Sequence, residues 1–156
     1  MSLYLADTAA TEALAIQTCQ LLPTDTSGWT VLLAGDLGAG KSTFARALIL
    51  AMGHSGPVPS PTYTLVEPYR LSGRNIYHID LYRISGDDEL RYLGWAELDD
   101  GLRLVEWPDR APGLAEQADL KVQLGYQGAG RVADIEGLSA RGTELAGSLT
   151  RFILSQ

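Results

Sequence analysis

GDLGAGKS, at residues 35–42, is the stretch of this chain that determines its fold. It fits the pattern G-x-x-x-x-G-K-[ST], in which a glycine-rich loop wraps around phosphate groups. The apolar run at residues 29–34 predicts a strand before the loop, and residues 43–52 predict a helix after it. A strand, this loop and a helix in that order predict that the chain binds a nucleoside triphosphate.

The loop has several expected ways of holding phosphate. Its glycines let the backbone curl so that successive N–H groups point inward, and the helix that follows adds its own unpaired donors. We expect the Lys41 ammonium to reach the β- and γ-phosphates and the Ser42 hydroxyl to ligate Mg²⁺. The loop residues expected to contact the nucleotide are Gly38, Ala39, Gly40, Lys41, Ser42 and Thr43.

Composition limits the classes of protein to which this chain can belong. A length of 156 residues fits one domain, taken here as residues 1–156. The formal net charge of −7 and the lack of a Lys/Arg cluster argue against direct binding of DNA or RNA. No apolar run approaches the roughly 18 residues of a membrane span, so we expect no membrane association and a cytoplasmic location.

The remaining patterns predict a mixed fold. Asp7 or Thr8 can cap a first helix that runs to about Leu22. Further elements are expected as two antiparallel hairpins (63–69 with 75–83, and 120–126 with 131–135), a short helix (87–93), a strand (102–107) and a closing helix (142–153). Together they predict one three-layer α/β domain of the P-loop NTPase class, with a mainly parallel sheet and antiparallel hairpins.

Two acidic residues are candidates for catalysis. Phosphoryl chemistry needs a carboxylate near the metal, usually at the end of an apolar strand beside the loop strand. Glu106 ends the more apolar run and is our better candidate for that acid, whereas Asp80 could hold a metal-bound water or orient the attacking one. The residues alone do not decide which of the two acids orients the attacking water. The alternative is that each acid pairs with a nearby arginine, such as Arg83 or Arg103, and has no catalytic role.

Other residues near these acids have less specific patterns. Thr62 lies in a proline-rich segment after the loop helix, where it could sense the γ-phosphate or could belong to a loop packed for its shape alone. His54 and His78 have no third ligand at useful spacing, so we do not expect them to bind metal. Trp107 is interpreted as core packing at the end of a strand.

Four segments taken together resemble the TsaE family, also called YjeE, of bacterial ATPases for tRNA threonylcarbamoyladenosine biosynthesis. The segments are GDLGAGKSTF (35–44), SPTYTLVEPY (60–69), YHIDLYR (77–83) and VEWP (105–108). The first segment alone would name only a superfamily, but the order and spacing of all four are specific.

The resemblance implies a cytoplasmic ATPase of weak intrinsic activity that uses ATP and Mg²⁺. In that family the ATPase works with TsaD and TsaB and resets them between turnovers, so contact with tRNA is only indirect, through the complex. The resemblance also implies roles for individual residues. Those residues are Lys41 and the loop for phosphates, Ser42 and Glu106 for the metal, Asp80 as catalytic acid, Thr62 as switch, Thr8 beside adenine and Arg131 in the C-terminal hairpin.

The chain departs from the family at one functional position. Many members have threonine where this chain has Ser42, but the hydroxyl is retained. Two other functions remain open from the residues alone. The first is a small-molecule kinase, although no arginine-rich lid is evident, and the second is a nucleotide-sensing module that does not hydrolyse ATP. The residues alone also do not distinguish ATP from GTP.

Overall fold

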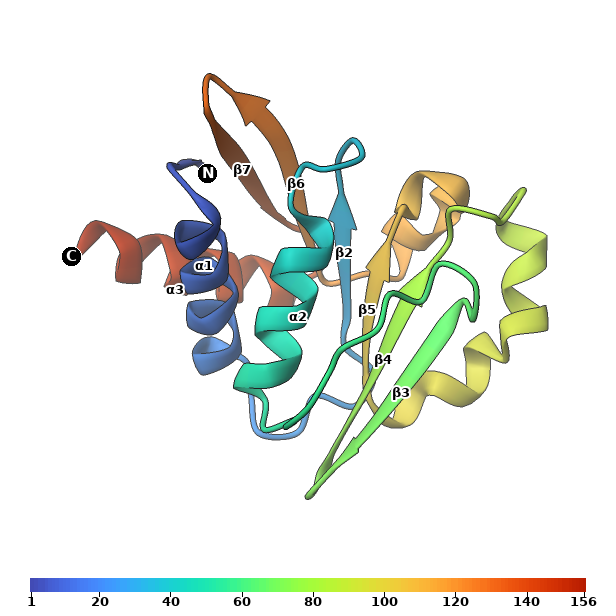
Figure 1. Ribbon diagram of the computed structural model, residues 1–156. Coiled ribbons are helices and arrows are strands. Elements are labelled where there is room, and N and C mark those ends of the chain that lie inside the picture. Colours follow the sequence, from blue (N-terminus) through green and yellow to red (C-terminus); the bar gives the residue numbers. More distant parts are fainter.

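All seven strands of the computed structural model, which describes residues 1–156, form one sheet in the order β1-β7-β6-β2-β5-β4-β3 (Figure 1). The strands are β1 (Ser2–Leu5), β2 (Thr30–Ala34), β3 (Val66–Leu71), β4 (Arg74–Asp80), β5 (Leu102–Glu106), β6 (Leu120–Gln127) and β7 (Gly130–Gly137). In the middle of the sheet β2 pairs in parallel with β5 and β6, and β4 pairs in parallel with β5. Antiparallel pairs complete both edges, which confirms the expected α/β class.

The parallel pairing brings the two candidate acids together. Every residue of β2 and β5 is buried, as expected for parallel strands covered on both faces. In the register of the sheet, Glu106 lies beside Leu33 of β2 on one side and beside Asp80 of β4 on the other. Because parallel strands end at the same edge, both carboxylates lie at the edge where the loop after β2 begins.

Three α-helices cover one face of the sheet. They are α1 (Thr8–Leu21), α2 (Lys41–Ala51) and α3 (Ala140–Leu154). Side chains of Asp7 and Ser139 cap α1 and α3 by accepting hydrogen bonds from backbone amides. Phe44 and Leu48 of α2 are fully buried in the same hydrophobic cluster as Val31 and Leu33 of β2, so the helix after the loop is part of the core on this face of the sheet.

Four 3-10 helices cover the other face, where the expected third layer is therefore not built from α-helices. They are η1 (Asp87–Leu93), η2 (Trp95–Asp100), η3 (Pro108–Arg110) and η4 (Pro112–Glu116). A second hydrophobic cluster forms there from Leu32, Ile79 and Val105 of the sheet and from Trp95 and Leu114. The helix expected at 87–93 is present, but glycines in non-helical conformations on both sides keep it short.

Both expected hairpins are present, but one strand was not predicted. β3 pairs with β4, and β6 with β7, at the expected turns. Residues Ser2–Leu5 form β1, which pairs with β7. The segment is too short to show the alternation that would predict a strand. The helix after the loop begins at Lys41, where its N-terminal donors were expected, two residues before the helix-like run at 43–52.

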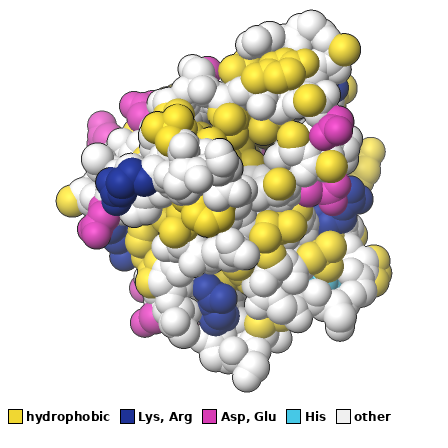
Figure 2. All heavy atoms as spheres, turned by 90° about the vertical axis from the view of Figure 1, so that its left-hand side faces the viewer, with side chains coloured by type: hydrophobic (Ala, Val, Ile, Leu, Met, Phe, Trp, Pro, Cys, Tyr) yellow, Lys and Arg dark blue, Asp and Glu magenta, His cyan; other side chains and the backbone are white.

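Figure 2 shows the side on which α1, α3 and both chain termini lie. Hydrophobic side chains reach this surface in several places, and the Lys and Arg side chains stand apart from one another. None of the helices combines the length and the apolar character that a membrane-spanning helix needs.

Candidate functional site

The backbone of the loop between β2 and α2 presents unpaired amide groups. Gly38 and Gly40 have left-handed φ angles of 80° and 114°, a conformation that favours glycine. Gly40 is the N-cap of α2, and no side chain caps the first turn there. The amides of that turn and the positive end of the helix dipole therefore remain available to an anion.

Lys41 is buried within this loop. Its Nζ atom donates hydrogen bonds to the carbonyls of Gly35 (2.5 Å) and Asp36 (3.0 Å) and lies 4.0 Å from the centre of the Trp107 ring. Burial lowers the pKa of the ammonium, although nearby carboxylates, Glu106 first among them, oppose this. A partly desolvated ammonium that lines a cavity interacts more strongly with an entering phosphate than it would in bulk water.

Glu106 links α2 to the sheet. Its Oε1 atom accepts a hydrogen bond from the Ser42 hydroxyl at 3.1 Å, and its Oε2 atom lies 2.5 Å from Nε2 of His78. A hydroxyl and a carboxylate are the hard oxygen donors that Mg²⁺ prefers, and Mg²⁺ takes its other ligands from water and substrate phosphates. The side chains present thus fit the ion that the sequence predicts.

Asp80 connects the site to the proline-rich segment. Its Oδ2 atom accepts a hydrogen bond from the Thr62 hydroxyl at 2.9 Å, and its Oδ1 atom accepts one from the Tyr82 amide at 2.8 Å. Only 3% of Asp80 is exposed. This hydrogen bond joins Thr62 to a residue 18 positions later in the sequence. A movement of the proline-rich segment would therefore change the contacts of the Asp80 carboxylate.

All the expected site residues line two adjoining cavities that meet at the glycine loop. One cavity, of about 280 Å³, is the phosphate-side cavity, where we expect the phosphates and the metal. The expected residues that line it are Gly38, Gly40, Lys41, Ser42, Thr43, Thr62, Asp80 and Glu106. The other, of about 300 Å³, is lined by Thr8, Ala39 and Arg131 and shares Gly38, Gly40 and Thr43 with the first. The arrangement suits an elongated ligand whose phosphates lie in the first cavity and whose remainder lies in the second.

The β6–β7 hairpin holds the loop from the side of the second cavity. The Tyr126 hydroxyl donates to the carbonyl of Leu37 at 2.7 Å, and Nη2 of Arg131 donates to the carbonyl of Gly38 at 3.2 Å. The Arg131 guanidinium also lies 4.2 Å from the centre of the Tyr126 ring. Arg131 thus contacts the loop itself, in addition to lining the cavity.

Three residues at the site were given no role in it by the sequence analysis. His78 contacts Glu106, and its place two residues before Asp80 on the same face of a strand was the available signal. Trp107 packs against the second hydrophobic cluster, as interpreted, but it also lines the phosphate-side cavity. Its φ of 58° marks strained backbone beside Glu106. Tyr126 lies in a hairpin far from the loop in sequence, so no local pattern pointed to it.

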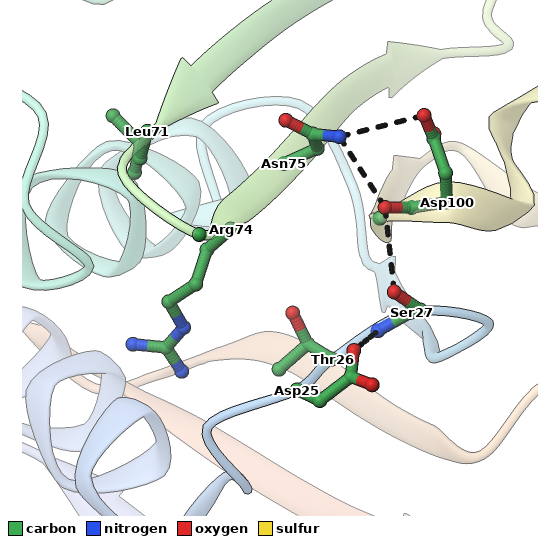
Figure 3. Close-up of a pocket in the computed structure, with 9 residues that line it drawn as sticks. Asp25, Thr26, Ser27, Leu71, Arg74, Asn75 and Asp100 are labelled. Carbon is green, nitrogen blue, oxygen red and sulfur yellow. Dashed lines mark hydrogen bonds between the residues drawn. The ribbon is translucent and has the colours of Figure 1, made fainter.

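A third cavity, of about 150 Å³, lies at the opposite ends of the strands, where β4 and β5 begin (Figure 3). Its polar groups are turned toward one another: Asn75 donates to the carbonyl and to the carboxylate of Asp100, and the Ser27 amide donates to Asp25. None of the expected site residues lines it. The Ser27 hydroxyl donates to the carbonyl of Asp100, which joins the loop before β2 to the end of η2.

Comparison with known proteins gives consistent results. Residues 5–133 match the family described as "Threonylcarbamoyl adenosine biosynthesis protein TsaE". The chain is 45% identical over 98 residues to the tRNA threonylcarbamoyladenosine biosynthesis protein TsaE of Haemophilus influenzae and 41% identical over 123 residues to that of Synechocystis. The first match spans 62% of this chain and 62% of the Haemophilus relative, and the second spans 75% and 76%.

A solved structure has the same fold along nearly the whole chain. The crystal structure of YdiB from Bacillus subtilis is similar to this structure with a TM-score of 0.75 and 26% sequence identity. The similarity covers 97% of this chain and 95% of that chain.

Proposed function

The chain belongs to the TsaE family of threonylcarbamoyl adenosine biosynthesis proteins, and from that premise we propose that it binds Mg-ATP and hydrolyses it slowly. Its place would be that of an accessory subunit in the modification of tRNA to N6-threonylcarbamoyladenosine. The observation that carries the proposal is the convergence of Lys41, Ser42, Asp80 and Glu106 on one cavity beside the glycine loop.

Binding of the triphosphate follows from the loop and its neighbours. The amides of the first turn of α2 and the Lys41 ammonium would hold the β- and γ-phosphates. To do so, Lys41 would exchange its bonds to the carbonyls of Gly35 and Asp36 for bonds to charged phosphate oxygens, which are stronger. Thr8 and Arg131 would border the nucleoside, because they line the second cavity.

Hydrolysis would depend on Asp80. This carboxylate would orient a water molecule and accept its proton while the water oxygen attacks the γ-phosphorus. The bond from that phosphorus to the bridging oxygen would break, and ADP would leave with the electron pair. Thr62, which donates to Asp80, would keep the carboxylate turned toward the cavity.

The metal side of the site would be formed by Ser42 and Glu106. Mg²⁺, when bound, withdraws charge from the β- and γ-phosphate oxygens. Ser42 would ligate it through the hydroxyl, and Glu106 would lie beside it, because the two side chains already touch.

Partners follow from the family resemblance. We propose that the chain works in the cytoplasm with proteins resembling TsaD and TsaB, and that it meets tRNA only through their complex. Slow hydrolysis would then change on titration with those partners, and a complex would appear on a sizing column. Unchanged hydrolysis with no complex would contradict this part of the proposal.

The activity is tested with two assays on matched variants. Lys41→Ala is expected to lose nucleotide affinity in calorimetry, because it removes the ammonium. Asp80→Asn is expected to bind ATP like the parent and to release phosphate at least a hundredfold more slowly, since a general base contributes roughly 10²–10⁴-fold. Asp88→Asn, which changes an exposed carboxylate on η1, is the control and leaves both measurements unchanged.

The same assays separate the alternatives. If Asp80→Asn and Glu106→Gln both bound ATP and matched the parent's turnover, neither carboxylate would have a catalytic role. If label from γ-labelled ATP appeared on an added metabolite in place of free phosphate, the chain would be a kinase. If the parent bound ATP without releasing phosphate even with partners present, it would be a nucleotide-sensing module.

A further inference from the structure

We propose that His78 is a positioning residue that holds the Glu106 carboxylate away from Lys41 and so keeps the lysine free for phosphate. This role rests on the proposed nucleotide binding and goes beyond it, because His78 itself does not line the phosphate-side cavity. The inference starts from a buried contact that the proposed chemistry does not use.

The two oxygens of Glu106 have different partners. His78 is 2% exposed and lies on β4, two residues before Asp80, on the face toward α2. Its Nε2 atom lies 2.5 Å from Oε2 of Glu106, while Ser42 occupies Oε1. With both oxygens engaged, the carboxylate has one orientation.

The other ring nitrogen of His78 indicates which atom carries the hydrogen. Nδ1 is buried and has no hydrogen-bond partner. A hydrogen on Nδ1 would be a buried unsatisfied donor, which is costly, whereas a bare acceptor there costs less. We therefore assign the hydrogen to Nε2, from which it is donated to the carboxylate of Glu106.

Without this hydrogen bond, the Glu106 carboxylate could rotate within the cavity that it lines together with Lys41. Among the carboxylates that act on Lys41, Glu106 has the largest electrostatic effect. In a site this buried, opposite charges attract far more strongly than in water. A Glu106 side chain released from His78 would turn to the ammonium, neutralise it and present negative charge to the incoming phosphates.

The test compares two substitutions of His78 in metal-free buffer with EDTA. His78→Leu removes the donor, whereas His78→Gln places an amide donor near the position of Nε2. Calorimetry with ATP should show about tenfold weaker binding for His78→Leu, the size expected from one charge-assisted hydrogen bond, and near-parent binding for His78→Gln. Thermal unfolding checks that both variants fold; if His78→Leu does not, His78→Asn, whose amide is too short to reach Glu106, replaces it.

The same substitution made in the Glu106→Gln variant distinguishes positioning of the carboxylate from a general packing effect. In Glu106→Gln there is no charge to restrain, so adding His78→Leu should change ATP affinity by less than about twofold. If the tenfold loss persisted in that background, His78 would act only through packing and the proposal would be overturned. Equal affinities of the parent and His78→Leu would overturn it as well and leave the proposed function intact. A parent that binds no ATP either in EDTA or with Mg²⁺ present would overturn both.

Discussion

The contact between Gly38 and Tyr126 leads to a prediction about how much strain the loop tolerates. A Cβ atom added at Gly38 would lie 2.5 Å from the Tyr126 hydroxyl oxygen, closer than nonbonded atoms come. Gly38→Ala therefore has two costs, one from left-handed backbone and one from displacing Tyr126. Gly73, in the β3–β4 turn, has a similar φ of 74° but nothing within 4 Å of an added Cβ, so Gly73→Ala has only the first cost.

The expected magnitudes follow from these geometries. Left-handed backbone costs a residue with a side chain roughly 1–2 kcal/mol, and restriction of the unfolded chain returns about 0.4–1 kcal/mol, so Gly73→Ala should lower the free energy of unfolding by about 1 kcal/mol. In Gly38→Ala, Tyr126 must also give up its 2.7 Å hydrogen bond to Leu37, which adds about 1 kcal/mol. The expected loss for Gly38→Ala is thus about 2 kcal/mol.

Urea denaturation measures both losses, and calorimetry with Mg-ATP measures the effect on the site. Affinity should fall about tenfold or more in Gly38→Ala, because Gly38 lines both cavities, and should not change in Gly73→Ala. Adding Tyr126→Ala should recover about 1 kcal/mol relative to additivity, since the clash is then gone. Equal stabilities of Gly38→Ala and Gly73→Ala, or strict additivity with Tyr126→Ala, would refute the reasoning.

Three further outcomes are expected. Burial opposes ionisation of Asp119, but hydrogen bonds from Arg141 and the Thr30 amide outweigh it and hold the pKa of the carboxyl below its usual value. The stability that this carboxylate contributes is present above about pH 4 and is lost as the pH falls through the lower folded-state pKa. Urea titrations at several pH values should therefore show a weaker loss of stability in acid for Asp119→Asn than for the parent. Ser42→Ala should bind ATP like the parent in EDTA and lose the gain in affinity on adding Mg²⁺, whereas Ser42→Thr keeps it; an unchanged gain in Ser42→Ala would remove the residue from the metal side. Phe44→Ala should lower the free energy of unfolding by about 3–5 kcal/mol in the same denaturation assay, because the ring is fully buried, and a loss below about 1 kcal/mol would contradict the described core.

The parts of the fold that could be predicted are those with local patterns. The glycine loop, its flanking strand and helix, and both hairpins each depend on neighbouring residues, and all are present. Strand ends in the first hairpin differ: β3 begins at Val66 where 63 was expected, and β4 ends at Asp80 where 83 was expected. The order of the strands in the sheet could not be predicted from local patterns, because the pairing of β2 with β5 and β6 depends on contacts between distant parts of the sequence. β1 is too short for periodicity to identify and forms only through β7.

In the candidate site, too, the residues marked by local patterns could be predicted and those placed by long-range contacts could not. Strand ends beside the loop pointed to Asp80 and Glu106, and the structure places them as register partners. The roles assigned to them remain predictions. His78 was considered only as a metal ligand, so its contact with a carboxylate was missed. Tyr126 and Trp107 depend on tertiary contacts with Leu37 and Lys41, which no spacing in the sequence reveals.

The second cavity joins early and late parts of the chain, and this has a consequence for biosynthesis. Thr8 lies near one end of the chain and Arg131 enters with β7, which is also the only partner of β1. While a ribosome is still translating the segment between them, the first strand has nothing to pair with and the cavity lacks one wall. A nascent polypeptide would therefore lack the complete ligand site until the last hairpin has emerged, and a product truncated before it would be left to chaperones and proteases.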